Sequence, residues 1–173
     1  EKAADWLPDF LVWGVHSGMR RGEILALTWG DLGSIKNGRL LVQIKKSKTD
    51  QFRNVECTAE MMEILERQKE RKIASSEAVF PVSPMTLRRR WEKARELADL
   101  RDVTIRDLRR THATYAITAG VDMKTVADRI GHADLGMLQK HYAAFQDGAQ
   151  AQAAKTIQAT VAEMKEQGRN AEE

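Results

Sequence analysis

The chain has 173 residues and a mass of 19.6 kDa, which suits one compact domain and leaves little room for two. Hydrophobic residues make up 42% and charged residues 31%, a composition that supports a folded core and excludes a disordered chain. No apolar run approaches the roughly 18 residues of a membrane span, and a single cysteine, Cys57, excludes an internal disulfide and a cysteine-rich zinc site. We therefore expect a cytoplasmic protein with no membrane partner, in which Cys57 is a small apolar residue.

The first half of the chain is predicted to form two helices followed by strands. Apolar residues recur at helical spacing over 8–29, around a glycine-flanked turn at 17–22. Two stretches favour strands, 38–44 after the hairpin dipeptide Asn37-Gly38 and 52–58 after a polar loop. We expect a small antiparallel sheet of about three strands.

Helices dominate the rest of the chain. Proline suits the first turn of a helix, so Ser83-Pro84 is a typical helix start, and Gly120 is a typical helix end. The predicted helices cover residues 58–72, 84–97, 102–119, 122–131, 134–142 and 149–167. The predicted fold class is therefore mainly α with a small three-stranded antiparallel β-sheet.

Charge is unevenly distributed, although the formal net charge is only +3 and the pI is near 9.1. Residues 36–53 hold six basic side chains against one acid, and residues 85–110 hold nine against five. Two basic blocks on one face would neutralise phosphates, and this electrostatic attraction dominates the affinity of proteins for nucleic acids. Two ordinary solvated surfaces would give the same counts, so charge alone leaves both readings open.

Three cations stand where a phosphate could be held. Arg20 lies between two glycines, where little bulk blocks a ligand and a guanidinium can meet two oxygens of one phosphate. Arg109 flanks the apolar Leu108, and Lys48 lies at the expected hairpin tip, which suits a proton donor that reaches out. Each of them taken singly also fits an ordinary surface cation.

A fourth place combines Gly131-His132 with Tyr142, ten residues after the histidine and across a helix of suitable length. Two nearby arginines would favour the ionised form of a tyrosine phenol and make it a usable nucleophile toward phosphorus. A core or surface tyrosine is the alternative for Tyr142 taken alone.

Taken in order, the four places resemble the tyrosine recombinase or phage integrase family, specifically its C-terminal catalytic domain. Residues 17–29 resemble the first arginine box of that family, with Arg20 as catalytic arginine and Glu23 as supporting acid. Residues 47–49 resemble the β-hairpin lysine with Lys48, and 107–114 the second box with Arg109. Residues 130–134 resemble the Leu-Gly-His turn with His132, and Tyr142 falls where the nucleophile falls. The resemblance covers about 8–145 and implies the catalytic-domain fold of tyrosine recombinases.

One position departs from the family. The family usually has histidine three residues before the second arginine, and this chain has Arg106. Arginine cannot act as a base at working pH, so Arg106 would donate hydrogen bonds or add positive charge. We therefore predict that Arg106 is a site residue with an altered role. The candidates to accept the proton of Tyr142 are then His132, water or the phosphate.

The resemblance implies site-specific recombination of phage or mobile-element DNA, with chemistry like that of type IB topoisomerases. Tyr142 attacks a backbone phosphorus while Arg20 and Arg109 hold the nonbridging oxygens. Lys48 protonates the departing 5′ oxygen, and His132 bonds to a phosphate oxygen. The 3′-phosphotyrosyl adduct retains the bond energy for rejoining. The resemblance implies neither metal nor cofactor.

The same resemblance implies how the chain is organised and what it binds. We expect one catalytic domain over 1–173, with its core at about 1–145 and a tail helix within 146–173, and a missing N-terminal core-binding domain. Ile157, Val161 and Met164 form an apolar stripe on that tail, which packs either on its own domain or on a neighbouring protomer. The expected partners are double-stranded attachment sites, a tetramer on DNA formed from a monomeric free domain, and accessory DNA-bending proteins.

Two other functions remain open. Residues 125–142 also have the helix, glycine turn and helix of a helix-turn-helix DNA reader, which would make the protein a regulator. A catalytically weakened integrase relative would explain Arg106. His16, His112 and His141 lack partners at metal-ligand spacing and are interpreted as helix-face residues.

Overall fold

The structure is a computed structural model that describes residues 6–34, 40–44, 52–71 and 76–131, together with Gly136, Lys155, Ile157 and Gln158. The chain divides into two compact units, Glu1–Leu135 and Gly136–Glu173, and the fold below is that of the first. Most of the predicted helices at 134–142 and 149–167 lies outside the described residues.

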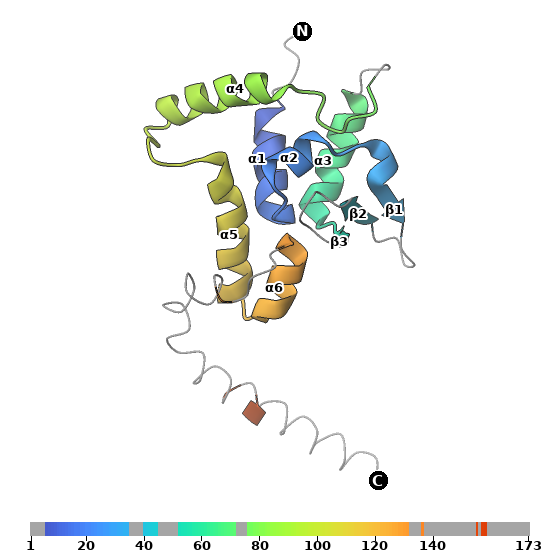
Figure 1. Cartoon of the computed structure of the whole chain (residues 1–173), viewed down its shortest axis with the longest axis vertical. Coiled ribbons are helices and arrows are strands. Elements are labelled where there is room, and N and C mark those ends of the chain that lie inside the picture. Colours follow the sequence, from blue (N-terminus) through green and yellow to red (C-terminus); the bar gives the residue numbers. More distant parts are fainter. Residues whose placement is uncertain are drawn as a thin grey trace. The chain divides into compact units, whose positions relative to one another are not determined.

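The first unit is mainly helical with a three-stranded antiparallel sheet, which confirms the predicted fold class (Figure 1). Its helices are α1 (Leu7–Ser17), α2 (Arg21–Leu25), α3 (Ala59–Glu70), α4 (Pro84–Leu97), α5 (Ile105–Thr118) and α6 (Met123–Ile130), with a 3-10 turn η1 (Trp29–Asp31). Its strands are β1 (Leu32–Ser34), β2 (Leu40–Ile44) and β3 (Arg53–Glu56) in the order β1-β2-β3.

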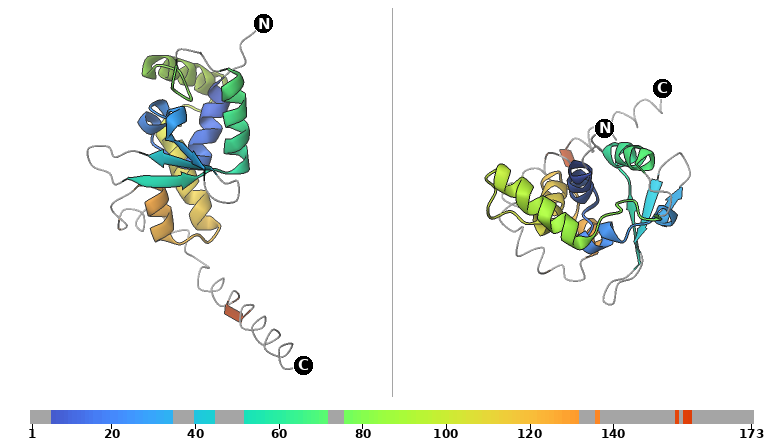
Figure 2. Two further views of the ribbon diagram at one scale, coloured as in Figure 1. Left: turned by 90° about the vertical axis from the view of Figure 1, so that its right-hand side faces the viewer. Right: turned by 90° about the horizontal axis from the view of Figure 1, so that it is seen from above.

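Helix α1 is the centre of this unit and packs against both α3 and α5 (Figures 1 and 2). Phe10 and Trp13 on α1 are fully buried, and each contacts the Phe80 ring edge-on at centroid distances of 5.4 and 5.9 Å. Aromatic pairs at this geometry add to the gain from burying their surface. The buried α1 helix therefore holds α3 and α5 in place on either side of it.

Helix starts follow the capping rules that the sequence suggests. Thr58, Ser83 and Asp122 each accept a hydrogen bond from a backbone N–H in the first turn of their helix, at 3.3, 3.0 and 2.9 Å. Helix α5 begins at Ile105, three residues later than predicted. Thr104 and Asp107 form a capping box there, and the carboxylate of Asp107 accepts from the Thr104 N–H at 2.8 Å.

The prediction of a second helix up to Trp29 is wrong, because α2 ends at Leu25. The chain then pairs in extended form with a distant segment: Val79 donates to the Leu27 carbonyl at 2.9 Å, and Trp29 donates to that of Glu77 at 3.0 Å. These long-range backbone bonds replace the helical ones.

Candidate functional site

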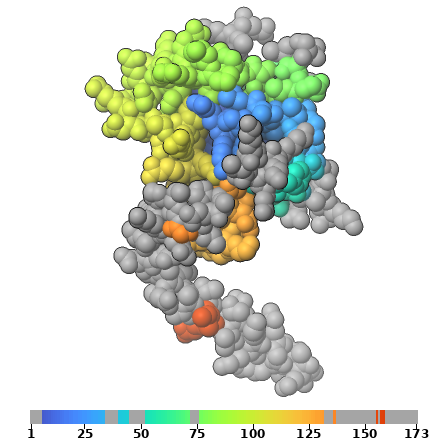
Figure 3. All heavy atoms as spheres, in the orientation of Figure 1, coloured from blue at the N-terminus to red at the C-terminus, as the bar shows by residue number. Residues whose placement is uncertain are grey.

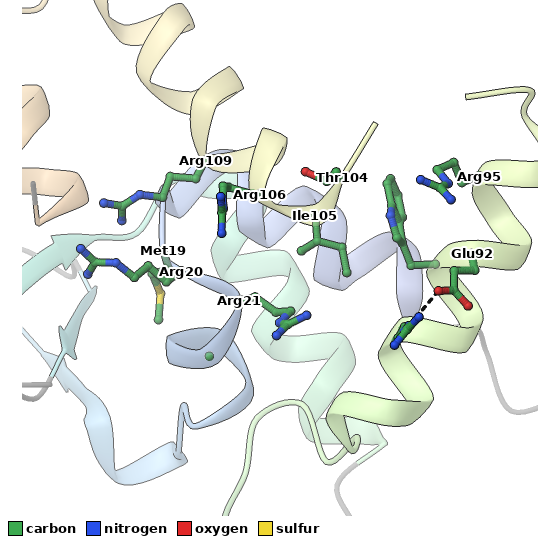
Figure 4. Close-up of a pocket in the computed structure, with 12 residues that line it drawn as sticks. Met19, Arg20, Arg21, Glu92, Arg95, Thr104, Ile105, Arg106 and Arg109 are labelled. Atoms are coloured by element: carbon green, nitrogen blue, oxygen red, sulfur yellow. Dashed lines mark hydrogen bonds and ion pairs between the residues drawn. The ribbon is translucent and has the colours of Figure 1, made fainter. Parts of the chain in front are cut away.

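A groove of about 880 Å³ lies where the start of α2, helix α4 and the N-terminal half of α5 come together (Figure 4). On the face drawn in Figure 3, green atoms of α4 and yellow atoms of α5 border the blue atoms of the α1–α2 region. The groove is lined by Met19, Arg20, Arg21, Gly22, Arg88, Trp91, Glu92, Arg95, Thr104, Ile105, Arg106 and Arg109. Six of these described residues are arginines and one is an acid, so the groove is strongly positive and suits an anion.

Arg20 reaches this groove from the N-cap position of α2. Gly18, in the left-handed conformation at φ 63°, ends α1 two residues earlier and turns the chain. The Arg20 guanidinium donates to Glu23 Oε1 at 3.0 Å and to the Gly131 carbonyl at 2.8 Å. These two bonds hold a side chain that is still 39% exposed.

Arg109 is tied to the same turn from the other side, because its Nη1 donates to the Gly18 carbonyl at 3.0 Å. A Cβ at Gly18 would lie 2.6 Å from Cδ2 of His112, so this turn lies too close to α5 for any larger residue. The close approach of α1 and α5 therefore places Arg20 and Arg109 beside one another.

Arg106 lies one helical turn before Arg109 on α5, on the same side of the helix, and it also lines the groove. Figure 4 shows Arg20 and Arg109 extending to the same side, with Arg106 next to them and the α4 residues across the groove. The structure thus brings together three of the six catalytic residues predicted from the sequence. The other three, Lys48, His132 and Tyr142, lie outside the described residues.

Glu23 is the acid that organises the arginine cluster. Burial raises the pKa of its carboxyl, but the hydrogen bonds from Arg53 and Arg20 outweigh burial and hold that pKa below its ordinary value. Arg53 contributes a fork, with Nη1 at 3.1 Å from Oε1 and Nη2 at 2.7 Å from Oε2. Glu23 is therefore a carboxylate at neutral pH that holds two guanidinium groups.

Sequence reasoning missed Arg53 and the groove-lining face of α4, although both had a signal. Arg53 faces inward with Val55, as the alternation of strand β3 would have indicated. Arg88, Trp91 and Arg95 line the groove from α4 at spacings of three and four residues, which place them on one helical face. The count of basic residues over 85–110 includes the two arginines but does not show that they share a helical face with Trp91.

The remaining titratable residues near the site have structural roles. His112 Nδ1 lies 2.8 Å from the Val15 carbonyl, which can only accept, so Nδ1 carries the proton. Burial raises the pKa of the Cys57 thiol to about 11, and Cys57 packs against the core as expected. In the described ranges, no three His, Cys, Asp or Glu side chains are grouped to hold a metal ion, and no helix is long and apolar enough to cross a membrane.

Residues 4–148 match the model of the phage integrase family. A protein of Haemophilus influenzae named as an integrase/recombinase is 30% identical over 132 residues, which are 76% of this chain and 42% of that protein. A second protein from the same organism, with the same name, is 27% identical over 76% of this chain and 34% of its own length. The chain thus spans less than half the length of these curated relatives.

Solved structures share the fold. XerH site-specific recombinase, in a post-cleavage complex with a palindromic difH substrate, superposes with a TM-score of 0.68 at 23% identity. The match covers 89% of this chain and 47% of that one. The catalytic domain of bacteriophage HP1 integrase superposes with a TM-score of 0.65 at 18% identity, over 87% of this chain and 81% of that one.

Proposed function

Because this chain belongs to the phage integrase family and has the fold of its catalytic domains, we propose that it cleaves and rejoins DNA strands during site-specific recombination. The observation that carries the proposal is the basic groove in which Arg20, Arg106 and Arg109 meet. Guanidinium groups from two separate elements can contact different oxygens of one phosphate and offset the charge that builds up in its transition state.

The proposed reaction needs no net change in bond energy. The Tyr142 phenol oxygen attacks a backbone phosphorus and loses its proton, while the bond from phosphorus to the 5′ oxygen breaks. Lys48 protonates that departing oxygen, and His132 donates to a phosphate oxygen. Arg20 and Arg109 hold the nonbridging oxygens throughout. Attack by a new 5′-hydroxyl then releases Tyr142 and reseals the strand.

Arg106 has a supporting part in this proposal. It lines the groove one turn from Arg109, and a guanidinium there adds a third positive charge next to the phosphate. Since arginine cannot accept a proton at working pH, the proton of Tyr142 goes to His132, to water or to the phosphate.

The proposed partner is duplex DNA at an attachment site, bound by four protomers in the cytoplasm with help from DNA-bending proteins. Helix α4 supports DNA binding, because Arg88 and Arg95 extend the positive lining beyond the three central arginines, with the neutral Trp91 between them. Binding through phosphates releases counterions, so we expect affinity to fall steeply with salt.

The test is covalent capture on nicked suicide duplexes that tile the DNA on either side of the gene. The expected result is a protein–DNA adduct that survives SDS and is lost in Tyr142→Phe. Tyr115→Phe is the matched control, because Tyr115 is the other of the two tyrosines and is exposed on α5. Loss of the adduct in Tyr115→Phe alone would contradict the assignment of the nucleophile.

A weakened relative that binds without cutting is the second candidate, and Arg106 is the observation that favours it. DNA binding without any adduct, alongside an active control enzyme, would support this candidate or a helix-turn-helix regulator. Recovery of an adduct in Arg106→His would then identify position 106 as the cause.

A further inference from the structure

Arg53 is a charged residue at a core-facing position of the sheet. It pairs with Ile44 across β2 and β3, alternates with the fully buried Val55, and is itself only 8% exposed. Burying a guanidinium is costly unless it is fully hydrogen-bonded and paired with a carboxylate. A buried arginine that pairs with the same carboxylate as Arg20 calls for a reason.

Every nitrogen of the Arg53 guanidinium has a partner. Nη1 and Nη2 donate to the two oxygens of Glu23 at 3.1 and 2.7 Å, and Nε donates to the Arg129 carbonyl at 3.0 Å. The planar fork therefore fixes both the position and the rotation of the Glu23 carboxylate.

The same carboxylate holds Arg20. Its Oε1 accepts from Arg20 Nη1 at 3.0 Å, and its Oε2 accepts from the Arg20 backbone N–H at 2.7 Å. The two guanidinium groups thus share one carboxylate, and a rotation of that carboxylate would move the Arg20 side chain. Arg20 touches the groove and Arg53 does not line it.

Both arginines also bind the end of α6. Arg53 donates to the Arg129 carbonyl and Arg20 to that of Gly131, so two positive charges meet the carbonyl end of that helix, where cations are favourable. Gly131 has φ 64°, and a Cβ there would lie 2.6 Å from Arg53 Nη1. The Arg53 side chain therefore packs directly against the backbone of this turn and leaves no room for a Cβ at position 131.

We propose that Arg53 is a positioning residue, which orients Arg20 through Glu23 and fixes the end of α6 against the same carboxylate. Its effect on cleavage rests on the function proposed above, whereas its effect on the Arg20 side chain does not. Preorganised charges are effective because nothing has to rearrange at the moment of reaction, and a misplacement of about 1 Å can cost about 100-fold in rate.

The first experiment compares Arg53→Gln, Arg53→Lys and wild type on the suicide duplex identified by covalent capture, in the full chain and at a temperature where each is folded. We expect single-turnover cleavage to fall about 10- to 100-fold in Arg53→Gln, the range for loss of a partner that orients a reacting group. DNA affinity should stay within about twofold, because Arg53 does not line the groove. Lysine keeps the charge but not the fork, so Arg53→Lys should also be slow.

The matched control is Arg71→Gln. Arg71 donates to the buried Asp9 at 2.8 Å and does not line the groove, so this change removes an arginine–carboxylate pair elsewhere. Equal losses of cleavage in Arg71→Gln and Arg53→Gln would overturn the proposal in favour of a general loss of stability. If Arg53→Gln fails to fold, Arg53→Lys carries the same comparison.

Two further readouts separate positioning from mere support. If Arg53 acts through Arg20, the rate of Arg20→Lys should fall less than twofold when Arg53→Gln is added, whereas independent effects would multiply. Nitrogen-15 NMR of the arginine side chains gives a readout that needs no cleavage. The Arg20 guanidinium signals should shift in Arg53→Gln and stay in place in Arg71→Gln, even if wild type forms no adduct. Unmoved Arg20 signals would overturn the proposal by themselves.

Discussion

Two carboxylates in the first unit are each held by two arginines, yet the surroundings of the two clusters differ. Asp9, on the first turn of α1, accepts from Arg67 at 2.9 Å, Arg71 at 2.8 Å and Gln68 at 2.8 Å, all from the C-terminal half of α3 or just beyond. This Asp9 cluster fastens α1 to α3. None of its four members lines the groove.

The Glu23 cluster, made of Glu23, Arg20 and Arg53, uses the same ion pairs in another place. One of its arginines is buried in the sheet, and the other lines the groove. The cluster also binds two backbone carbonyls at the end of α6. Similar chemistry thus stabilises a helix pair in one region and orients a side chain that lines the groove in the other.

The largest effects should come from neutralising each carboxylate. Arg53 is 8% exposed and would be left as a buried charge in Glu23→Gln, so we expect a loss of about 3 to 5 kcal/mol in the free energy of unfolding. Arg67 is 44% exposed and can turn to water in Asp9→Asn, so we expect about 2 to 3 kcal/mol there. Urea unfolding measures both.

Cleavage should separate the two variants even more clearly. At a temperature where both are folded, Glu23→Gln should lose about 10- to 100-fold in single-turnover rate, because Arg20 loses the carboxylate that orients it. Asp9→Asn should cleave at the wild-type rate. A slow Asp9→Asn with a normal Glu23→Gln would reverse the roles that we assign to the two clusters.

Much of this fold could be predicted from local sequence signals. Pro84 and Gly131 mark a helix start and a helix end that the structure places as expected. The segment after Leu25 could not be predicted, because its pairing with 77–79 depends on backbone bonds across about 50 residues of chain. Strand β1 is only three residues long and carries too few side chains for a visible alternation.

The candidate site was predictable to a similar degree. Motifs identify Arg20 and Arg109, the position three residues before the second arginine identifies Arg106, and the approach of α1 to α5 brings them into one groove. The contact between Arg53 and the end of α6 could not be predicted. Arg53 Nε donates to the Arg129 carbonyl at 3.0 Å, and the two residues are 76 positions apart in sequence. Tertiary structure alone supplies that contact.

A middle-sized effect should follow from adding one methyl group next to the Glu23 cluster. Gly131→Ala and Gly120→Ala both place alanine at positive φ, 64° and 85°, which costs about 1 to 2 kcal/mol. Of the two, Gly131 is the one where the new Cβ meets another group, since no atom of the described residues lies within 4 Å at Gly120. We therefore expect a larger loss of stability in Gly131→Ala by thermal unfolding.

The same pair of variants tests the link from Arg53 to the reaction. Gly131→Ala must displace the Arg53 fork, so its cleavage rate should fall, while Gly120→Ala should cleave normally. Equal stabilities and equal rates in the two variants would mean that the end of α6 and Arg53 are not coupled.

The smallest effect concerns pH and distinguishes the two regions in another way. Burial lowers the pKa of His112, which donates from Nδ1 to α1 and lies near Arg129 and Arg109, while the Asp9 cluster contains no histidine. Above the ordinary pKa of about 6.5, His112 is neutral in both the folded and the unfolded chain. As pH decreases below this value, the unfolded chain takes up a proton before the folded chain does. The free energy of unfolding therefore decreases as pH decreases, until the lowered pKa of the folded chain is reached.

Asparagine can place an N–H donor close to that of histidine Nδ1 without titrating, so His112→Asn should remove this pH dependence. The difference in unfolding free energy between His112→Asn and wild type should be constant above pH 7.5. It should change below pH 6.5 by less than about 1.4 kcal/mol per pH unit, the limit for one proton. Asp9→Asn should retain the wild-type slope in this window, because its cluster contains no histidine. A slope that survives in His112→Asn would place the titrating group elsewhere.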